Sequence, residues 1–154
     1  MKQFSLFGIN ASSLKVSSLI GYLPEESLIF EGVSALEFLI LIGTCKGLTR
    51  TSLLKQIIYL SSLFEISPYY DYYLTQLSPG TLRKLNIVAA LLGPPRLIVL
   101  DDPFRDIDPY VKRVIIMCLE SYVKHRTLTM LFTSRTPETK LSTRVISMQE
   151  IWNN

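Results

Sequence analysis

The feature of this sequence that most restricts its fold is a continuous apolar run, LIVL at residues 97–100, that ends on two aspartates, Asp101 and Asp102. A run of this kind, without polar alternation, is typical of a parallel β-strand that is buried on both faces. The surrounding segments follow the order strand, helix, strand, helix, strand. We therefore expect an α/β fold in which right-handed crossovers join the strands of a parallel sheet.

A helix is predicted immediately before this strand. Ser78 is a suitable N-cap, and Pro79 suits the first helical turn, where its missing N–H is least harmful. Leucine, valine and alanine side chains recur on one face of the segment until Gly93 and the two prolines after it end the helix. Asp108 and Pro109 start another helix after the strand. The strand is thus expected to have a helix on each side of it in the chain.

Further strands and helices are expected along the rest of the chain. The strands are placed at 3–7, 18–22, 127–133 and 144–148. The helices are placed at 35–46 and from about 50 to 64, as the capping residues and the apolar spacing predict. Residues 29–76 are therefore expected to be helical, with strands on both sides. This order indicates a helical insertion within an α/β core rather than a separate linker-joined domain.

Composition and charge argue against several classes of function. The net charge is only +3 and the basic residues are scattered, which does not fit a nucleic-acid-binding protein. The tyrosines at 69–73 are expected to form a packed aromatic face, with a base-stacking platform as the alternative. A single histidine leaves little for a zinc site or a catalytic triad, and Cys45 and Cys118 are expected to be buried free thiols. The most apolar segment, 36–43, is too short to span a bilayer.

Two features of the central region suggest chemistry on phosphates. The N-terminus of the predicted helix, with Ser78 and Gly80, offers free N–H groups and a positive dipole end to an anion. Asp101, at the end of the strand, is suited to hold a hydrated Mg²⁺, and Asp102 is placed to orient or deprotonate a water molecule. Glu25 follows the end of another predicted strand, where ligands bind in open α/β sheets. Together these residues predict phosphoryl transfer.

Four motifs closely resemble those of the nucleotide-binding domain of ABC transporters, and they stand in the right order. They correspond to the Q-loop region, the signature motif, the Walker B strand with the catalytic glutamate position, and the D-loop: IGYLPEE at 20–26, LSPGT at 77–81, LIVLDD at 97–102 and DIDP at 106–109. The segment GVSALEFL, after the first motif, resembles the start of that domain's helical subdomain. The resemblance covers nearly the whole chain.

The resemblance implies an incomplete P-loop NTPase core of the ABC type, with a mostly parallel sheet and an inserted helical subdomain. Residues 1–154 would form a single partial nucleotide-binding domain, with the α/β core at 1–28 and 77–154 and the helical subdomain at 29–76. Members of this family are ATPases that work as head-to-tail dimers. Each ATP lies between the Walker A loop of one subunit and the signature helix of the other.

The resemblance also implies roles for individual residues, with ATP and Mg²⁺ as the cofactors. Asp102 stands at the position of the catalytic glutamate, and Arg135 at that of the switch histidine. The binding residues form two sets: Ser78, Gly80, Glu25 and Asp108 for ATP, and Asp101 and Glu25 for Mg²⁺.

The sequence departs from the family at positions that matter for catalysis. No glycine is followed five residues later by Gly-Lys-Ser/Thr, so no Walker A loop is found, and the chain is expected to be the C-terminal part of the domain. Asp102 places its carboxylate about 1.5 Å further back than a glutamate would. Arg135 cannot exchange a proton near neutral pH. We therefore expect the isolated chain neither to bind ATP tightly nor to hydrolyse it.

Three hypotheses about function remain open at this point. The chain is an ATP-binding subunit of an ABC transporter, or a truncated part of one, that couples ATP binding and hydrolysis to membrane transport. Alternatively, it is a non-catalytic interaction subunit that donates its signature motif to a partner with a Walker A loop. In the third hypothesis it is a truncated product without a function of its own.

The resemblance implies two partners: a second nucleotide-binding subunit, identical or different, and a transmembrane permease subunit. Nucleic acid is not expected as a partner. The implied location is cytoplasmic, on the inner face of the membrane, where the permease would hold the chain. An open sheet edge and an exposed apolar face predict aggregation, or dependence on a partner, when the chain is expressed alone.

Overall fold

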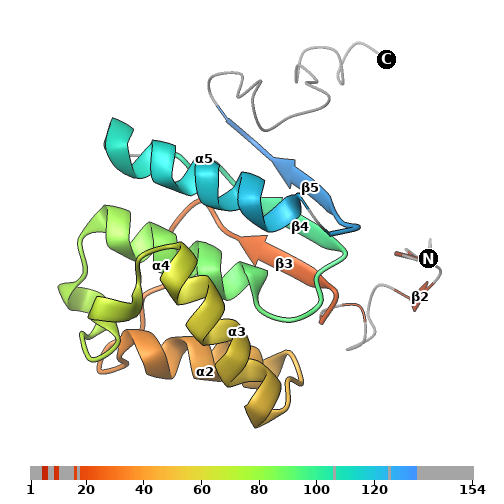
Figure 1. Cartoon of the computed structure of the whole chain (residues 1–154), viewed down its shortest axis with the longest axis horizontal. Helices are drawn as coiled ribbons and strands as arrows, with labels where there is room; N and C mark the ends of the chain where they lie inside the picture. The colour runs from red at the N-terminus through yellow and green to blue at the C-terminus, as the bar shows by residue number, and fades with distance from the viewer. Residues whose placement is uncertain are drawn as a thin grey trace.

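Three parallel strands form the central sheet. The computed structural model describes residues 5–6, 9–10, 16, 18–105, 107–124 and 126–134. The strands lie in the order β3 (Ile20–Leu23), β4 (Leu97–Leu100) and β5 (Thr129–Phe132), as Figure 1 shows. Leu23 pairs with Leu100, and Leu100 with Phe132, so the three strands end side by side.

A short antiparallel pair, β1 (Ser5–Leu6) and β2 (Ile9–Asn10), precedes the sheet. The helical elements among the described residues are α2 (Ala35–Cys45), α3 (Arg50–Leu63), the 3-10 turns η1 (Ser67–Tyr69) and η2 (Leu74–Gln76), α4 (Pro79–Leu91) and α5 (Pro109–Val123).

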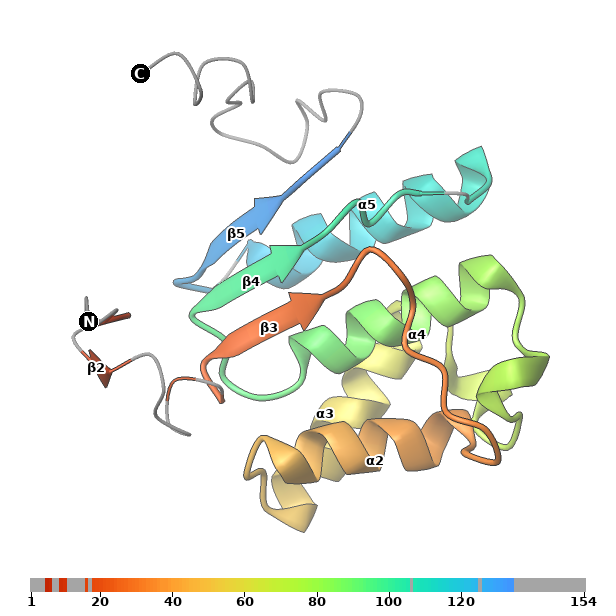
Figure 2. The same cartoon turned by 180° about the vertical axis from the view of Figure 1, so that it is seen from behind.

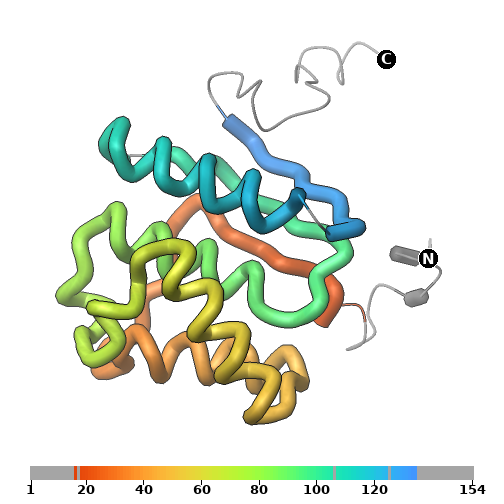
Figure 3. The backbone as a smooth tube through the Cα atoms, in the orientation of Figure 1, coloured from red at the N-terminus to blue at the C-terminus, as the bar shows by residue number. Residues whose placement is uncertain are grey.

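The helices of the described residues gather on one face of the sheet. Figures 1 and 2 show α4 and α5 on this face, with α2 and α3 packed against α4 on the side away from the strands. The tube in Figure 3 shows that the chain leaves β3, forms the helices at 29–76 and returns to the sheet through α4. Helix α4 is therefore the element that joins the sheet to α2 and α3.

Side-chain caps explain where the longer helices begin. Ser34 accepts the backbone N–H of Glu37, whose carboxylate accepts the N–H of Ser34 in return, which makes a capping box for α2. Thr49 caps α3, Ser78 caps α4 and Asp108 caps α5 in the same way, through a side-chain oxygen that accepts N–H groups of the first turn. These caps confirm the helix starts predicted from the sequence.

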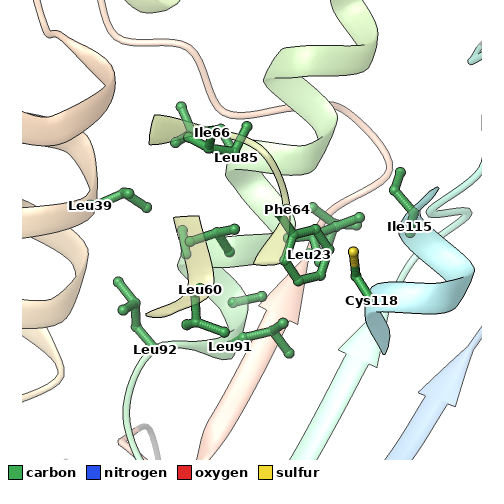
Figure 4. Close-up of a cluster of buried hydrophobic side chains, with 14 of the residues drawn as sticks. Leu23, Leu39, Leu60, Phe64, Ile66, Leu85, Leu91, Leu92, Ile115 and Cys118 are labelled. Atoms are coloured by element: carbon green, nitrogen blue, oxygen red, sulfur yellow. The ribbon is translucent and has the colours of Figure 1, made fainter. Parts of the chain in front are cut away.

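The core lies between α3, α4, α5 and the sheet. Figure 4 shows part of it, with Leu23 of β3, Leu85 of α4, Phe64 after α3 and Ile115 of α5 among its buried side chains. Helix α4 is buried at every position from 81 to 91. A helix that is surrounded in this way must find a partner for each of its polar side chains.

Two sequence expectations about burial are corrected by the structure. Strand β4 is fully buried on one face only: Ile98 and Leu100 are buried, whereas Leu97 and Val99 are half-buried. The reason is that the described helices pack on the face of Ile98 and Leu100. Cys118 is buried, as expected, but Cys45 is exposed because it ends α2 at the surface. The strand expected at 144–148 lies outside the described residues.

Candidate functional site

The residues singled out from the sequence gather at the carboxyl ends of the strands. Glu25 follows β3 by two residues, Asp101 and Asp102 follow β4 directly, and Thr133 follows β5. In Figure 1 the strand arrowheads point to the side of the molecule where α4 and α5 begin. This is the edge at which open parallel sheets bind their ligands.

Arg83 of α4 lies at the centre of this arrangement. Its side chain is buried, and its guanidinium donates hydrogen bonds to five main-chain carbonyls. Two belong to the segment after β3 and three to the segment after β4: Pro24 at 2.9 Å, Glu25 at 3.0 Å, Asp101 at 2.7 Å, Asp102 at 2.7 Å and Pro103 at 3.4 Å. Because a guanidinium has five N–H groups, every donor of Arg83 is used.

Burial lowers the pKa of Arg83 below its ordinary value. The nearby carboxylates of Asp102, Asp101 and Glu25 raise this pKa, but they offset the effect of burial only in part. The positive charge of the Arg105 guanidinium also lowers the pKa of Arg83. Since arginine loses its proton only at very high pH, Arg83 carries a positive charge among these carboxylates near neutral pH.

Thr133 connects the two aspartates after β4. Its hydroxyl donates a hydrogen bond to Oδ1 of Asp101 at 2.7 Å and accepts the backbone N–H of Asp102 at 2.8 Å. Asp102 has a φ of 40°, in the left-handed region that residues with a side chain rarely adopt. Thr133 and Arg83 therefore hold the backbone of Asp102 from both its N–H and its C=O in a strained conformation.

Glu25 forms an ion pair with Arg105, which lies between β4 and α5. Among the described residues, no three His, Cys, Asp or Glu side chains gather closely enough to hold a metal ion. Mg²⁺ commonly takes only one or two protein carboxylates and completes its shell with waters and phosphate oxygens. Asp101 fits this role as a single ligand. Glu25 fits it less well, because Arg105 already neutralises its carboxylate.

The start of α4 is exposed, as an anion site requires. The hydroxyl of Ser78 accepts the N–H of Thr81 at 3.2 Å and shares a hydrogen bond with the Thr81 hydroxyl at 2.8 Å. Gly80 lies against Val111 of α5, and an added Cβ would come within 3.3 Å of that side chain. The N-termini of α4 and α5 are thus packed together.

Asp108, the other residue expected to contact ATP, caps α5. Its Oδ1 accepts the N–H groups of Tyr110 and Val111 at 2.9 and 3.0 Å. Arg135, expected at the switch-histidine position, lies outside the described residues.

The sequence reasoning missed three residues that shape the site: Arg83, Arg105 and Thr133. Arg83 and Lys84 are two of the scattered basic residues of the sequence, but both side chains are buried. Lys84 forms an ion pair with Glu65 at 3.4 Å. The available signal was the apolar character of α4 on all sides, because a cation inside such a helix must have partners.

No protein-family model matches the chain, but curated relatives are found. The ATP-binding protein YhaQ, an uncharacterized ABC transporter protein of Bacillus subtilis (strain 168), is 31% identical over 94 residues, which cover 61% of this chain and 32% of that protein. An ABC transporter ATP-binding protein of Alkalihalophilus pseudofirmus is 29% identical over 93 residues, with 60% and 35% covered. The chain spans about a third of the length of these two relatives.

Solved structures share the fold. An ATP-binding subunit of an ABC transporter superposes with a TM-score of 0.74 at 22% identity, over 85% of this chain and 55% of that one. The ATP-binding cassette MJ0796, in a dimeric post-hydrolysis state bound to ADP and Pi, gives 0.68 at 18% identity, over 83% and 60%. The described part of the chain contains no helix that is both long and apolar enough to cross a membrane.

Proposed function

We propose that this chain, a homologue of the ATP-binding proteins of ABC transporters with part of their cassette fold, forms the signature-bearing part of an ATP-binding subunit of an ABC transporter. Residues 1–28 and 77–154 would supply the α/β core, and 29–76 the helical subdomain. In this proposal the chain couples events at a nucleotide to a membrane-bound partner.

The observation that carries the proposal is the position of α4. Its exposed N-terminus, with Ser78 and Gly80, lies on the same side of the molecule as the carboxylates that follow β3 and β4, and Arg83 of the same helix binds both loops. Pro79 has no N–H, and the N–H groups of Thr81 and Leu82 are bonded to Ser78, so the Gly80 N–H and the positive dipole end are what suits the terminal phosphate of a nucleotide. Ser78, Gly80 and Asp108 are therefore proposed to contact ATP.

The carboxylates would serve the same nucleotide. Asp101 is proposed to hold a hydrated Mg²⁺, and Asp102 to orient water from the glutamate position. A metal ion supplies charge stabilisation on phosphate oxygens when it is bound. Thr133 would hold the Asp101 carboxylate in the orientation that binds Mg²⁺. Arg135 would contribute a positive charge at the position of the switch histidine.

A second nucleotide-binding subunit is the first proposed partner. The cassette MJ0796 is dimeric in its solved structures. For this chain, the exposed Ser78 face would close on an ATP that the Walker A loop of the other subunit holds. That loop would come from a different subunit or from a further segment of the same protein.

A membrane-spanning permease is the second proposed partner. Helix α2 and the loop before it expose apolar side chains: Leu28, Ile29, Phe30, Ile40 and Leu41. Exposed apolar side chains in adjoining elements mark surfaces that bind other proteins. The permease would hold the chain on the cytoplasmic face of the membrane.

The test is ATP-dependent association. The tagged chain is purified from its native host with ATP and Mg²⁺, or with EDTA, and the captured subunits are identified. A subunit with a Walker A loop should be captured with ATP and lost with EDTA, and Ser78→Arg should abolish its capture by placing a bulky cation in the phosphate site. Capture that survives Ser78→Arg would contradict the proposal, and Thr51→Arg at the exposed start of α3 is the control for added charge.

The second candidate is a non-catalytic subunit that contributes only its signature face. It is favoured by the Glu25–Arg105 ion pair and by the aspartate at position 102. ATP hydrolysis by the captured complex, measured with and without Asp102→Asn, separates the two: hydrolysis that depends on Asp102 supports the catalytic subunit.

A further inference from the structure

We propose that Arg83 is the positioning residue of the carboxylate site: it sets the segment after β3 and the segment after β4 at fixed positions relative to the helix that begins at Ser78. The effect of Arg83 on catalysis rests on the proposed function. Its effect on the positions of the two segments depends only on the contacts of Arg83.

The contacts of Arg83 bridge segments that are far apart in the sequence. The same Nη1 atom reaches Pro24 and Glu25, and the Nη2 atom reaches Asp101 and Asp102. The two segments are therefore held apart by the width of one guanidinium group. That width is rigid, because the group is planar.

No other residue type can make this set of bonds. Lysine has three donors on one nitrogen, which are too few for five carbonyls and cannot be divided between two segments that lie along different edges of a guanidinium. Methionine has a similar length and no donors. Since the Arg83 side chain is only 3% exposed, water cannot easily replace the lost donors.

The position of the acceptors gives these bonds a role in the site. The carbonyl groups of Asp101 and Asp102 belong to the residues whose carboxylates are proposed to act on Mg²⁺ and water, and the carbonyl of Glu25 belongs to the residue that pairs with Arg105. A guanidinium bound to those carbonyls fixes the position of the backbone from which the three side chains extend. Catalytic groups displaced by about 1 Å lose about a hundredfold in rate, so an error at this point would be costly.

A spectroscopic measurement tests the contacts without any substitution. When all N–H groups of a guanidinium are bonded, rotation about its Cζ–Nη bonds is slow and separate Nη proton signals are resolved. We expect ¹⁵N-labelled full-length protein, alone or in its captured complex, to show separate signals for one arginine, which disappear in Arg83→Lys. An Arg83 signal averaged by fast rotation in a folded protein would overturn the assignment.

A matched pair of variants tests the positioning. Lys46 is a half-buried cation that is also bound to carbonyls of α4, but at the other end of the helix, where it donates to Ala89, Ala90 and Leu92. Hydrogen exchange at the amides of Asp101 and Asp102, which are bonded to Leu23 and Thr133, should accelerate about tenfold or more in Arg83→Met and Arg83→Lys. That factor is the equivalent of one lost bond to a charged group, and the exchange should not change in Lys46→Met. Equal acceleration in all three variants, or throughout the chain, would show a general loss of stability and overturn the assignment.

Catalysis provides the last readout, in the captured complex. Arg83→Lys should lower kcat about a hundredfold and leave KM within about twofold. KM should change little because the guanidinium of Arg83 donates to none of the residues proposed to bind ATP, which are Ser78, Gly80 and Asp108. An unchanged kcat would overturn the assignment. A complex that does not form, or does not hydrolyse ATP, would count against the proposed function instead, while the exchange and signal measurements would still decide the role of Arg83.

Discussion

At the scale of single residues, Lys46 shows how one side chain can donate hydrogen bonds to the carbonyls at the end of a helix from another part of the chain. It follows α2, and its Nζ donates to the carbonyls of Ala89, Ala90 and Leu92 at 3.1, 3.0 and 2.9 Å. These carbonyls lie at the C-terminal end of α4, where the helix dipole favours a cation. Burial lowers the pKa of Lys46 from 10.5 to about 8.

This lowered pKa predicts how stability depends on pH. The unfolded chain keeps its ordinary lysine pKa of 10.5, so between pH 8 and 10.5 it binds the proton more tightly than the folded chain does. The contribution of Lys46 to stability therefore increases as the pH rises through this interval, by about 1.4 kcal/mol per pH unit. Denaturant unfolding at pH 7.5, 9 and 10 measures it.

Lys46→Met is the comparison variant for the pH dependence. Cys118 acts in the opposite direction, since burial raises its pKa from 9 to about 11, and both proteins share this contribution. The difference in unfolding free energy between wild type and Lys46→Met should therefore move in favour of the wild type from pH 8 to 10. A difference that stays constant over this interval would contradict the lowered pKa of Lys46.

At the scale of elements, the packing of β3 on α4 depends on Gly21. A Cβ built at Gly21 overlaps the carbonyl oxygen of Ala90, which belongs to the backbone of α4 and cannot move aside. Gly21→Ala should therefore lower the free energy of unfolding by about 2 kcal/mol or more. Chemical denaturation of the purified chain, or of its complex, gives this value.

Gly43 of α2 provides the control for Gly21. A Cβ at Gly43 also meets a neighbour, but the neighbour is the end of the Leu53 side chain, which can change its rotamer. Gly43→Ala should cost clearly less than Gly21→Ala. Equal losses of stability would show that β3 does not approach α4 as closely as the structure describes.

The elements themselves were largely predictable from the sequence, because their signals are local. Strand β4 was predicted at its observed residues, and the starts of α2, α4 and α5 followed from their caps. The site was less predictable, because its contacts are distant in the sequence. Arg83 meets carbonyls 58 and 59 residues before it, and Thr133 meets Asp101 only because the parallel register brings the ends of β4 and β5 together.

At the scale of the whole molecule, the sheet has one face that no described helix covers. The register aligns Tyr22, Val99 and Leu131 across the three strands on that face. Tyr22 is 57% exposed and Leu131 59% exposed. An aligned apolar row of this kind favours association with another surface.

We expect the row to drive self-association of the isolated chain. Leu131→Lys should shift the chain toward the monomer in light-scattering measurements across a concentration series, while its unfolding free energy stays within about 0.5 kcal/mol. Met117 of α5 is 66% exposed and serves as the control, because Met117→Lys adds the same charge elsewhere. If Met117→Lys has an equal effect, net charge rather than the sheet face controls association.

The bonds of Arg83 also have a consequence for sequence change over evolution. All five of its acceptors are main-chain carbonyls, which every amino acid carries. The side chains at positions 25, 101 and 102 can therefore be exchanged without removing any of these bonds. Glu25 at the proposed Q-loop position and Asp102 at the proposed glutamate position fit an anchor of this kind, because such an anchor preserves the architecture of the site while its reactive groups diverge.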